Sequence, residues 1–203
     1  MTILSGQQVC PTNRRMTFEE YLSYDDGTNT RYELVDGVLV AMGAESALNI
    51  SIAFFLAIAF AQQGIPPYRI GNKHLIAVSS TKVTARDPDL TIHSEASYNA
   101  VITEKQSFLG FDQPSPLLVV EVVSPGKPGE SNYDRDYIEK RQEYAARGIP
   151  EYWLIDPDRQ VVLVLTLQGQ SYQEQSFTGQ TAIVSPTFPS LKLTADLILQ
   201  AGQ

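Results

Sequence analysis

The spacing of apolar and polar positions predicts a chain of mixed helices and strands. Helices are expected at about 18–24, 46–63 and 133–147, a β-hairpin at 31–42, and strands at about 69–78, 82–93, 116–123, 151–156, 160–167 and 171–177. The hairpin rests on Asp36-Gly37, because Asp-Gly between two apolar runs is a strong turn signal. The helix at 46–63 combines small residues with isoleucine and phenylalanine, which predicts that it is buried.

The run PLLVVEVV at residues 116–123 is apolar except for Glu121. Such a run is typical of a central strand that is buried on both faces of a sheet. The order of elements favours one mixed α/β (α+β) domain over residues 16–203, with a substantially antiparallel sheet. Residues 1–15 are polar and aperiodic, and are expected to form a flexible N-terminal lead-in.

Composition narrows the classes of protein that fit. The chain has 203 residues, 43% of them hydrophobic, which suits a single globular domain. Its longest apolar stretch, residues 50–61, is too short to span a bilayer, and no signal-peptide pattern opens the sequence. A cytoplasmic location is therefore expected. The single cysteine, Cys10, excludes a disulfide framework, and His74 and His93 are too few for a three-histidine zinc site.

The formal net charge of −8 argues against tight, non-specific binding of nucleic acid, because an acidic surface repels a phosphate backbone. No helix-turn-helix, zinc finger or basic tail indicates a dedicated DNA-reading domain.

Three carboxylates on separate predicted strands suggest a site for a hard cation. Glu121 is the most informative, because an unpaired carboxylate inside an apolar strand costs several kcal/mol. Asp89 follows Pro88 and opens a strand, and Glu33 lies within the hairpin. Oxygen ligands of this kind suit Mg²⁺ or Mn²⁺. The simpler alternatives are a core ion pair for Glu121, a turn residue for Asp89 and a solvent-facing position for Glu33.

The helix predicted at 133–147 supplies a cation for such a site. Asp136, Lys140 and Tyr144 follow one another at helical spacing and share one face. The alternative for Lys140 is a surface ion pair with Asp136, which contributes only a few tenths of a kcal/mol.

These residues resemble the PD-(D/E)XK nuclease superfamily and, more narrowly, the Uma-two family of restriction-endonuclease-like proteins. The carrying segments are MTFEEYL, RYELVDGVLVAM, RDPDLTI, LLVVEVVSPG, DRDYIEKRQEYAARGIPEYWLIDP and SPTFPSLKL, which together cover roughly residues 16–199. The resemblance implies a mixed β-sheet flanked by helices. It also implies hydrolysis of DNA phosphodiester bonds that depends on Mg²⁺ or Mn²⁺.

The resemblance assigns roles to individual positions. Asp89 and Glu121 are the implied metal ligands, with the backbone carbonyl of Val122 as a further ligand and Glu33 completing the catalytic set. The superfamily's usual lysine position is occupied here by Val123, so Lys140 is expected to supply the cation from the helix. Asp136 and Tyr144 are supporting positions, and Lys73 and Lys127 are weaker candidates for the catalytic lysine.

Two other functions fit the same residues. One is a catalytically impaired nuclease fold kept as a binding or assembly module, with a homodimer built on an exposed sheet edge or on the Trp153 region. The other is a metal-dependent hydrolase of a small phosphate ester. A positive cleft over Glu121 would favour DNA cleavage, and the arginines that could line it are Arg69, Arg86, Arg135, Arg141 and Arg147. A homodimer is expected, and no membrane partner is.

Overall fold

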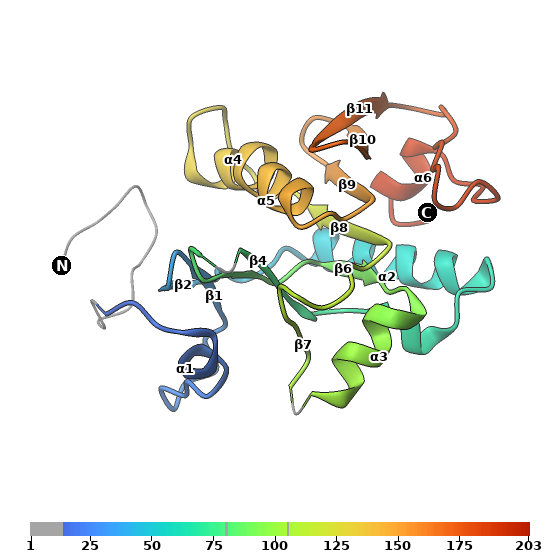
Figure 1. Ribbon diagram of the computed structural model, residues 1–203. Helices are drawn as coiled ribbons and strands as arrows, with labels where there is room; N and C mark the ends of the chain where they lie inside the picture. The colour runs from blue at the N-terminus through green and yellow to red at the C-terminus, as the bar shows by residue number, and fades with distance from the viewer. Residues whose placement is uncertain (1–13, 80, 105) are drawn as a thin grey trace.

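A computed structural model describes residues 14–79, 81–104 and 106–203 (Figure 1). Residues 1–13 of the predicted lead-in, including Cys10, lie outside the described residues. The helices are α1 (Phe18–Leu22), α2 (Ala47–Gln62), η1 (Pro67–Arg69), α3 (Glu95–Thr103), α4 (Ser131–Asp134), η2 (Arg135–Glu139), α5 (Lys140–Ala146) and α6 (Ala195–Leu199). The strands are β1 (Tyr32–Val35), β2 (Val38–Ala41), β3 (Ile70–Gly71), β4 (Leu75–Ser79), β5 (Thr84–Arg86), β6 (Leu90–Ile92), β7 (Phe108–Leu109), β8 (Leu118–Val122), β9 (Glu151–Asp156), β10 (Val161–Gln168) and β11 (Ser171–Phe177).

The strands form two sheets rather than one. The first has the order β2-β1-β5-β4-β7 and the second the order β11-β10-β9-β8-β6-β3. Most neighbours are antiparallel, as expected, and the pairs β4–β7 and β8–β9 are parallel. The result is a mixed α+β fold in which both sheets are flanked by helices (Figure 1).

The second sheet is covered on both faces, which explains the apolar run of β8. On one face, Val120 and Val122 pack with Leu56 of α2 and with α6. On the other face, Val119 and Val123 pack with Tyr144 of α5. Every residue of β8 is buried, so Glu121 is a carboxylate inside the core. Alternation along the strand places Glu121 on the same face as Val119, toward α5.

The Asp-Gly hairpin is present as predicted. Val35 pairs with Val38 across the turn, and Asp36 and Gly37 both have positive φ, at 50° and 78°. Two consecutive residues of positive φ are the requirement of a type I′ turn, which explains why Asp-Gly stands there. The hairpin packs on α1 through Leu34 and Leu39. The other face of β1 is left for Glu33.

Several predicted elements differ from the structure. The strands expected at 69–78 and 82–93 are each broken into two short strands. The helix expected at 133–147 begins at Ser131 and contains a π-helical turn, η2. The helix α2 was expected to be buried, yet one of its apolar faces is exposed, because only one side of it packs on the second sheet.

Trp153, on β9 of the second sheet, is completely buried beneath α2, where it packs against Phe60. The expectation that the Trp153 region forms a dimer surface is therefore wrong. Its position in the core follows from β9, which is a central strand with all six residues buried.

Among the described residues, none of the helices is both long enough and apolar enough to cross a membrane.

Candidate active site

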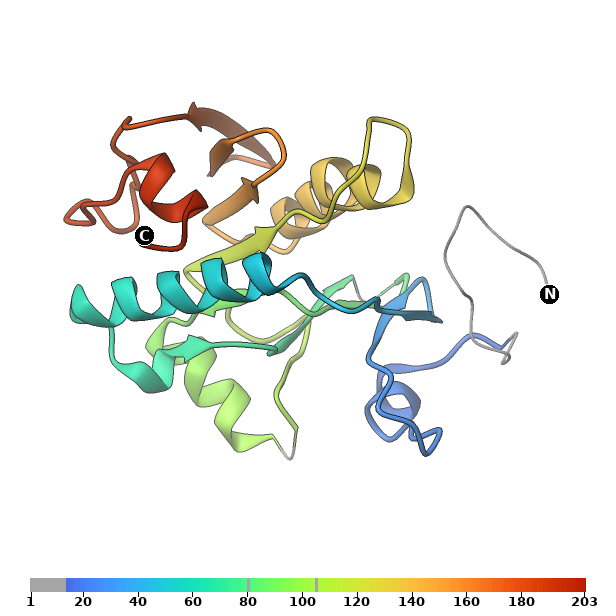
Figure 2. The same ribbon diagram turned by 180° about the vertical axis from the view of Figure 1, so that it is seen from behind.

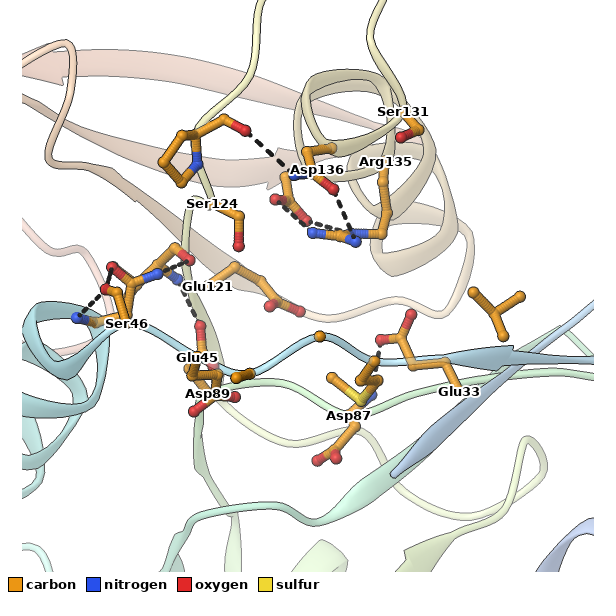
Figure 3. Close-up of a pocket in the computed structure, with 18 of the residues that line it drawn as sticks. Glu33, Glu45, Ser46, Asp87, Asp89, Glu121, Ser124, Ser131, Arg135 and Asp136 are labelled. Carbon is orange, nitrogen blue, oxygen red and sulfur yellow. Dashed lines mark hydrogen bonds and ion pairs between the residues drawn. The ribbon is translucent and has the colours of Figure 1, made fainter. Parts of the chain in front are cut away.

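A polar pocket of about 660 Å³ opens where the two sheets meet (Figure 3). Its walls come from the hairpin, the loop before α2, the segment between β5 and β6, the end of β8, and the helical segment α4–η2–α5. Six carboxylate residues line it, together with two cations: Glu33, Glu45, Asp87, Asp89, Glu121 and Asp136, with Arg135 and Lys140. The lining is acidic, although Arg31, Lys73 and Arg86 beside it pair with several of these carboxylates, so the site keeps only a small excess of negative charge.

Asp89 and Glu121 are brought side by side by strand pairing. The antiparallel register pairs Leu90 with Val120, which places Asp89 opposite Glu121 one residue further along. Residues opposite one another on antiparallel strands have their side chains on one face, with Cβ atoms about 5 Å apart. The Oδ2 atom of Asp89 accepts a hydrogen bond of 2.7 Å from the backbone N–H of Val122, which fixes its carboxylate at this edge.

Lys140 reaches the same place from the helix. Its Nζ atom lies 2.8 Å from Oε2 of Glu121 and 3.1 Å from Oδ1 of Asp136. Its side chain is only 5% exposed, so the pair with Asp136 is buried rather than at the surface. The hydroxyl of Tyr144 donates a hydrogen bond of 2.6 Å to Oε1 of Glu121. One helix face therefore holds both oxygens of the buried glutamate.

The π-helical turn η2 lies immediately before Lys140. A π turn inserts one residue into a helix and rotates the following residues relative to the preceding ones. Here the turn carries Asp136, and the α-helix resumes at Lys140, so both side chains face β8. Arg135, the first residue of the turn, pairs with Asp136 at 3.1 Å and also lines the pocket.

Burial and charge set the protonation states of this cluster. Burial raises the pKa of Glu121 to about 7, and although Lys140 opposes this rise, Asp89 and Asp136 add to it. Burial also raises the pKa of Asp89, against the lowering effect of the Val122 N–H. For Asp136, burial is outweighed by Lys140 and Arg135, which leave its pKa below the usual value.

The ammonium of Lys140 stays charged. Burial would lower the pKa of Lys140, but Glu121 and Asp136 outweigh it and raise that pKa above its ordinary value. Lys140 can therefore act as a fixed positive charge or hydrogen-bond donor near neutral pH, but not as a general base.

Glu33 is buried and contributes to an ion-pair network beside the pocket. Its Oε2 atom lies 3.1 Å from Nη1 of Arg86, and its Oε1 atom accepts a hydrogen bond from the backbone N–H of Asp87. Arg86 also pairs with Glu139 and Glu143. Although burial acts to raise it, the pKa of Glu33 is held below its ordinary value by Lys140 and Arg86. The solvent-facing alternative for Glu33 is wrong.

Two further residues lie at the site: Lys73, a weaker candidate from the sequence, and Asn49, which the sequence did not mark. Lys73 contacts Glu45 and lies 3.5 Å from Oδ1 of Asp89, so it is a third cation at the site beside Arg135 and Lys140, whereas Lys127 does not line the pocket. Asn49 donates a hydrogen bond of 3.2 Å to the carbonyl of Val122. No local pattern marks Asn49, because the docking of α2 brings it to the site.

Of the five arginines considered for a positive cleft, only Arg135 lines the pocket. Arg69 pairs with Glu95 and Arg141 with Glu174. Arg147 donates hydrogen bonds to backbone carbonyls, and Arg86 is held by the Glu33 network. These arginines do not converge on Glu121.

The donor chemistry of the pocket suits a hard divalent cation. Asp89, Glu121 and the Val122 carbonyl lie together at the end of β8, where Glu121 contacts Lys140 and Tyr144 and the Val122 carbonyl accepts a hydrogen bond from Asn49. Among the described residues, no three His, Cys, Asp or Glu side chains are grouped so as to enclose an ion. This arrangement fits Mg²⁺, which typically uses one or two carboxylates and completes its coordination with water and substrate oxygens.

Fold and pocket together define a mixed α+β protein with a site built of carboxylates and a lysine. The chain belongs to the Uma2 family, whose model, described as "Putative restriction endonuclease", matches residues 18–196. A similar solved structure is titled "Crystal structure of a putative nuclease belonging to DUF820 from Anabaena variabilis ATCC 29413". It has a TM-score of 0.70 and 17% sequence identity, over 93% of this chain and 99% of that one. Among curated proteins, no match is found.

Proposed function

We propose that this chain is a divalent-metal-dependent endonuclease that hydrolyses phosphodiester bonds of DNA in the pocket around Glu121. The observation that carries the proposal is the meeting of Asp89, Glu121 and Lys140 in one pocket of a chain from a nuclease-like family. The family supports nuclease chemistry, and the pocket supports the choice of residues.

Asp89, Glu121 and the Val122 carbonyl are the groups that would hold Mg²⁺ or Mn²⁺. A divalent ion bound there would acidify a water molecule and stabilise negative charge on the phosphate. The hydrogen bond from Val122 N–H to Asp89 and the bond from Tyr144 to Glu121 keep both carboxylates oriented for that role.

Lys140 supplies a permanent positive charge beside the metal-binding carboxylates. In the reaction, a water oxygen attacks phosphorus and loses a proton to solvent, while the bond from phosphorus to one ester oxygen breaks and that oxygen takes up a proton from solvent. Negative charge builds on the phosphate oxygens in the transition state, and a nearby ammonium stabilises it. The element that carries the lysine matters little for this role, so Lys140 on α5 serves where Val123 occupies the usual position on the strand.

The acidic pocket has a consequence for substrate binding. Without a cation, its carboxylates repel a phosphate, so DNA binding would depend on the metal and weaken with salt. The same acidity favours the alternative of a catalytically impaired binding module, because that alternative needs no phosphate in the pocket. A cytoplasmic location is part of the proposal, supported by the single cysteine of the chain.

The test is cleavage of supercoiled, linear and single-stranded DNA by the full chain with Mg²⁺ or Mn²⁺, together with calorimetric titration of Mn²⁺. We expect metal-dependent cleavage that is lost in Asp89→Ala and Glu121→Gln. The matched control is Glu174→Gln, which removes a carboxylate from an exposed ion pair outside the pocket. A wild-type protein that binds no Mn²⁺ and cleaves none of these DNA forms would refute the proposal and leave the binding-module alternative. Cleavage of small phosphate esters alone would point to the third function.

A further inference from the structure

The helix α2 is a surface helix without a charged residue. All sixteen of its residues, ALNISIAFFLAIAFAQ, are uncharged. In Figure 2 it lies across the face of the molecule, in front of the strands that it covers. Surface helices normally carry charged residues on their outer face, because that face is solvated. An uncharged outer face therefore needs another explanation.

Four large apolar side chains of α2 are exposed, and three of them, Ile50, Phe54 and Ile58, share its outer face, whereas Leu48 lies about 120° around the helix from Phe54. Leu48 is 43% exposed, Ile50 53%, Phe54 67% and Ile58 43%. They account for half of the large hydrophobic residues that are exposed among the described residues. The inner face is occupied, because Ile52, Leu56 and Phe60 are fully buried against the second sheet. The outer face of α2 therefore takes no part in the core of the fold.

We infer that the outer face of α2 is the contact surface of a homodimer, in which two copies of the helix pack antiparallel about a two-fold axis at Phe54. The spacing of the exposed residues supports this arrangement. Ile50, Phe54 and Ile58 follow one another at four-residue intervals, and the order Ile–Phe–Ile reads the same in both directions. About a two-fold axis, Phe54 meets its own copy and Ile50 meets Ile58. Such self-complementarity is the requirement of an isologous interface.

Charge does not oppose a second copy at this helix. The chain has a net charge of −8, so two copies repel each other over most of their surfaces. The helix brings no like charges together, and Glu45 just before it is neutralised by Lys73 and Arg31. The edge strand β11 is less suitable, because Gln173, Glu174, Gln175 and Ser176 are all exposed and polar.

The size of the surface predicts a weak dimer. Half-exposed apolar side chains offer roughly 100 Å² each, so Ile50, Phe54 and Ile58 of both copies give about 600 Å². The neighbouring Ala47, Ser51 and Gln62 extend this toward the roughly 1,200 Å² of small specific interfaces. We therefore expect a dissociation constant on the order of 10 μM.

The dimer would place the second copy close to the mouth of each pocket. Ser46 and Asn49, at the amino end of α2, line the pocket. In an antiparallel pair they lie beside the carboxyl end of the helix in the second copy. The two pockets therefore lie at opposite ends of the shared interface. Dimerisation through α2 does not depend on whether the pocket cleaves DNA.

The first experiment is sedimentation velocity of the full chain over a concentration range of about 1–100 μM. Wild-type protein is expected to pass from monomer to dimer over this range. Phe54→Glu places two like charges at the axis and should raise the dissociation constant about 30-fold or more. The matched control is Ile102→Glu on α3, which alters another exposed apolar residue, 62% exposed, and should leave association unchanged. Circular dichroism melting checks that both variants fold.

The second experiment tests the antiparallel pairing by cross-linking in a Cys10→Ser background. A mixture of Ile50→Cys and Ile58→Cys proteins should cross-link, as should Phe54→Cys alone, whereas Ile50→Cys alone should not. Efficient cross-linking of Ile50→Cys with itself would overturn the antiparallel arrangement. A wild-type protein that stays monomeric at about 100 μM would contradict the proposed dimer. If the monomer bound phospholipid vesicles through Phe54, the outer face of α2 would instead contact a lipid surface. If the protein dimerised only after removal of residues 1–13, those residues would instead cover this face.

Discussion

The Nζ atom of Lys140 lies 2.8 Å from the carboxylate of Glu121, and both side chains are about 95% buried. Two charges taken out of water stabilise a fold only when their geometry is good and their remaining hydrogen-bond positions are filled. Here Asp136 and Tyr144 fill them. The pair therefore costs the protein little while it is intact, and it keeps a charged lysine within reach of the pocket.

Replacing Lys140 should damage stability and activity in separable ways. Lys140→Met leaves Glu121 and Asp136 buried without their shared partner, which should cost about 3–5 kcal/mol in the free energy of unfolding. Adding Glu121→Gln should recover much of this loss, because one unpaired charge is removed, but should not restore cleavage. Urea unfolding and a DNA cleavage assay measure the two effects. Equal stability of the single and the double variant would contradict the electrostatic account.

The hydroxyl of Tyr144 should matter for the orientation of Glu121. Tyr144→Phe removes the buried hydroxyl that donates the 2.6 Å hydrogen bond to Oε1 of Glu121. The loss of this hydrogen bond should lower the free energy of unfolding by about 1–3 kcal/mol. Urea unfolding measures this cost. Tyr172→Phe is a suitable comparison, because its hydroxyl donates to the backbone carbonyl of Ile149 and not to the pocket. Mn²⁺ affinity should fall in the Tyr144 variant and stay unchanged in the comparison.

Glu33 should behave as a supporting residue and not as a metal ligand. In Glu33→Gln, Arg86 loses one of its carboxylate partners but keeps Glu139 and Glu143. We expect a loss of about 1–3 kcal/mol in stability, with Mn²⁺ affinity unchanged in calorimetry. Unchanged stability combined with lost Mn²⁺ binding would show instead that Glu33 binds the ion directly.

The paired histidines should make the fold less stable in acid. Nε2 of buried His93 lies 2.9 Å from Nδ1 of His74, and burial, with His74 and Arg69 nearby, lowers the pKa of His93 to about 4. An unfolded histidine has a pKa near 6.5. Between these values the unfolded state binds more protons, so this contribution is present above pH 6.5 and is lost as the pH falls toward 4.

The loss should amount to about 3 kcal/mol at most. Urea unfolding across this pH range measures it, and His93→Gln should flatten the slope between pH 6.5 and 4. A slope that persists unchanged in the variant would assign the acid sensitivity to other groups.

Local sequence was sufficient for those elements whose signals are short-range. The Asp36-Gly37 turn requires positive φ, and the chain supplies residues that accept it. The strands at 151–156 and 161–168 follow from apolar runs, and the strand at 171–177 follows the turn after the second of them. Glu121 stood out because a charge inside an apolar strand is costly wherever that strand packs.

The sequence alone marked the candidate site residues, and the tertiary structure decided which of them meet. Asp89 lies beside Glu121 because β6 and β8 pair in one register, and Lys140 reaches Glu121 from a helix that docks on that face. Tertiary packing also decided that Glu33 pairs with Arg86, that Trp153 is buried, and that one side of α2 stays exposed. Periodicity reports only that a face is apolar. What covers that face depends on elements distant in the chain, and their placement is a property of the whole fold.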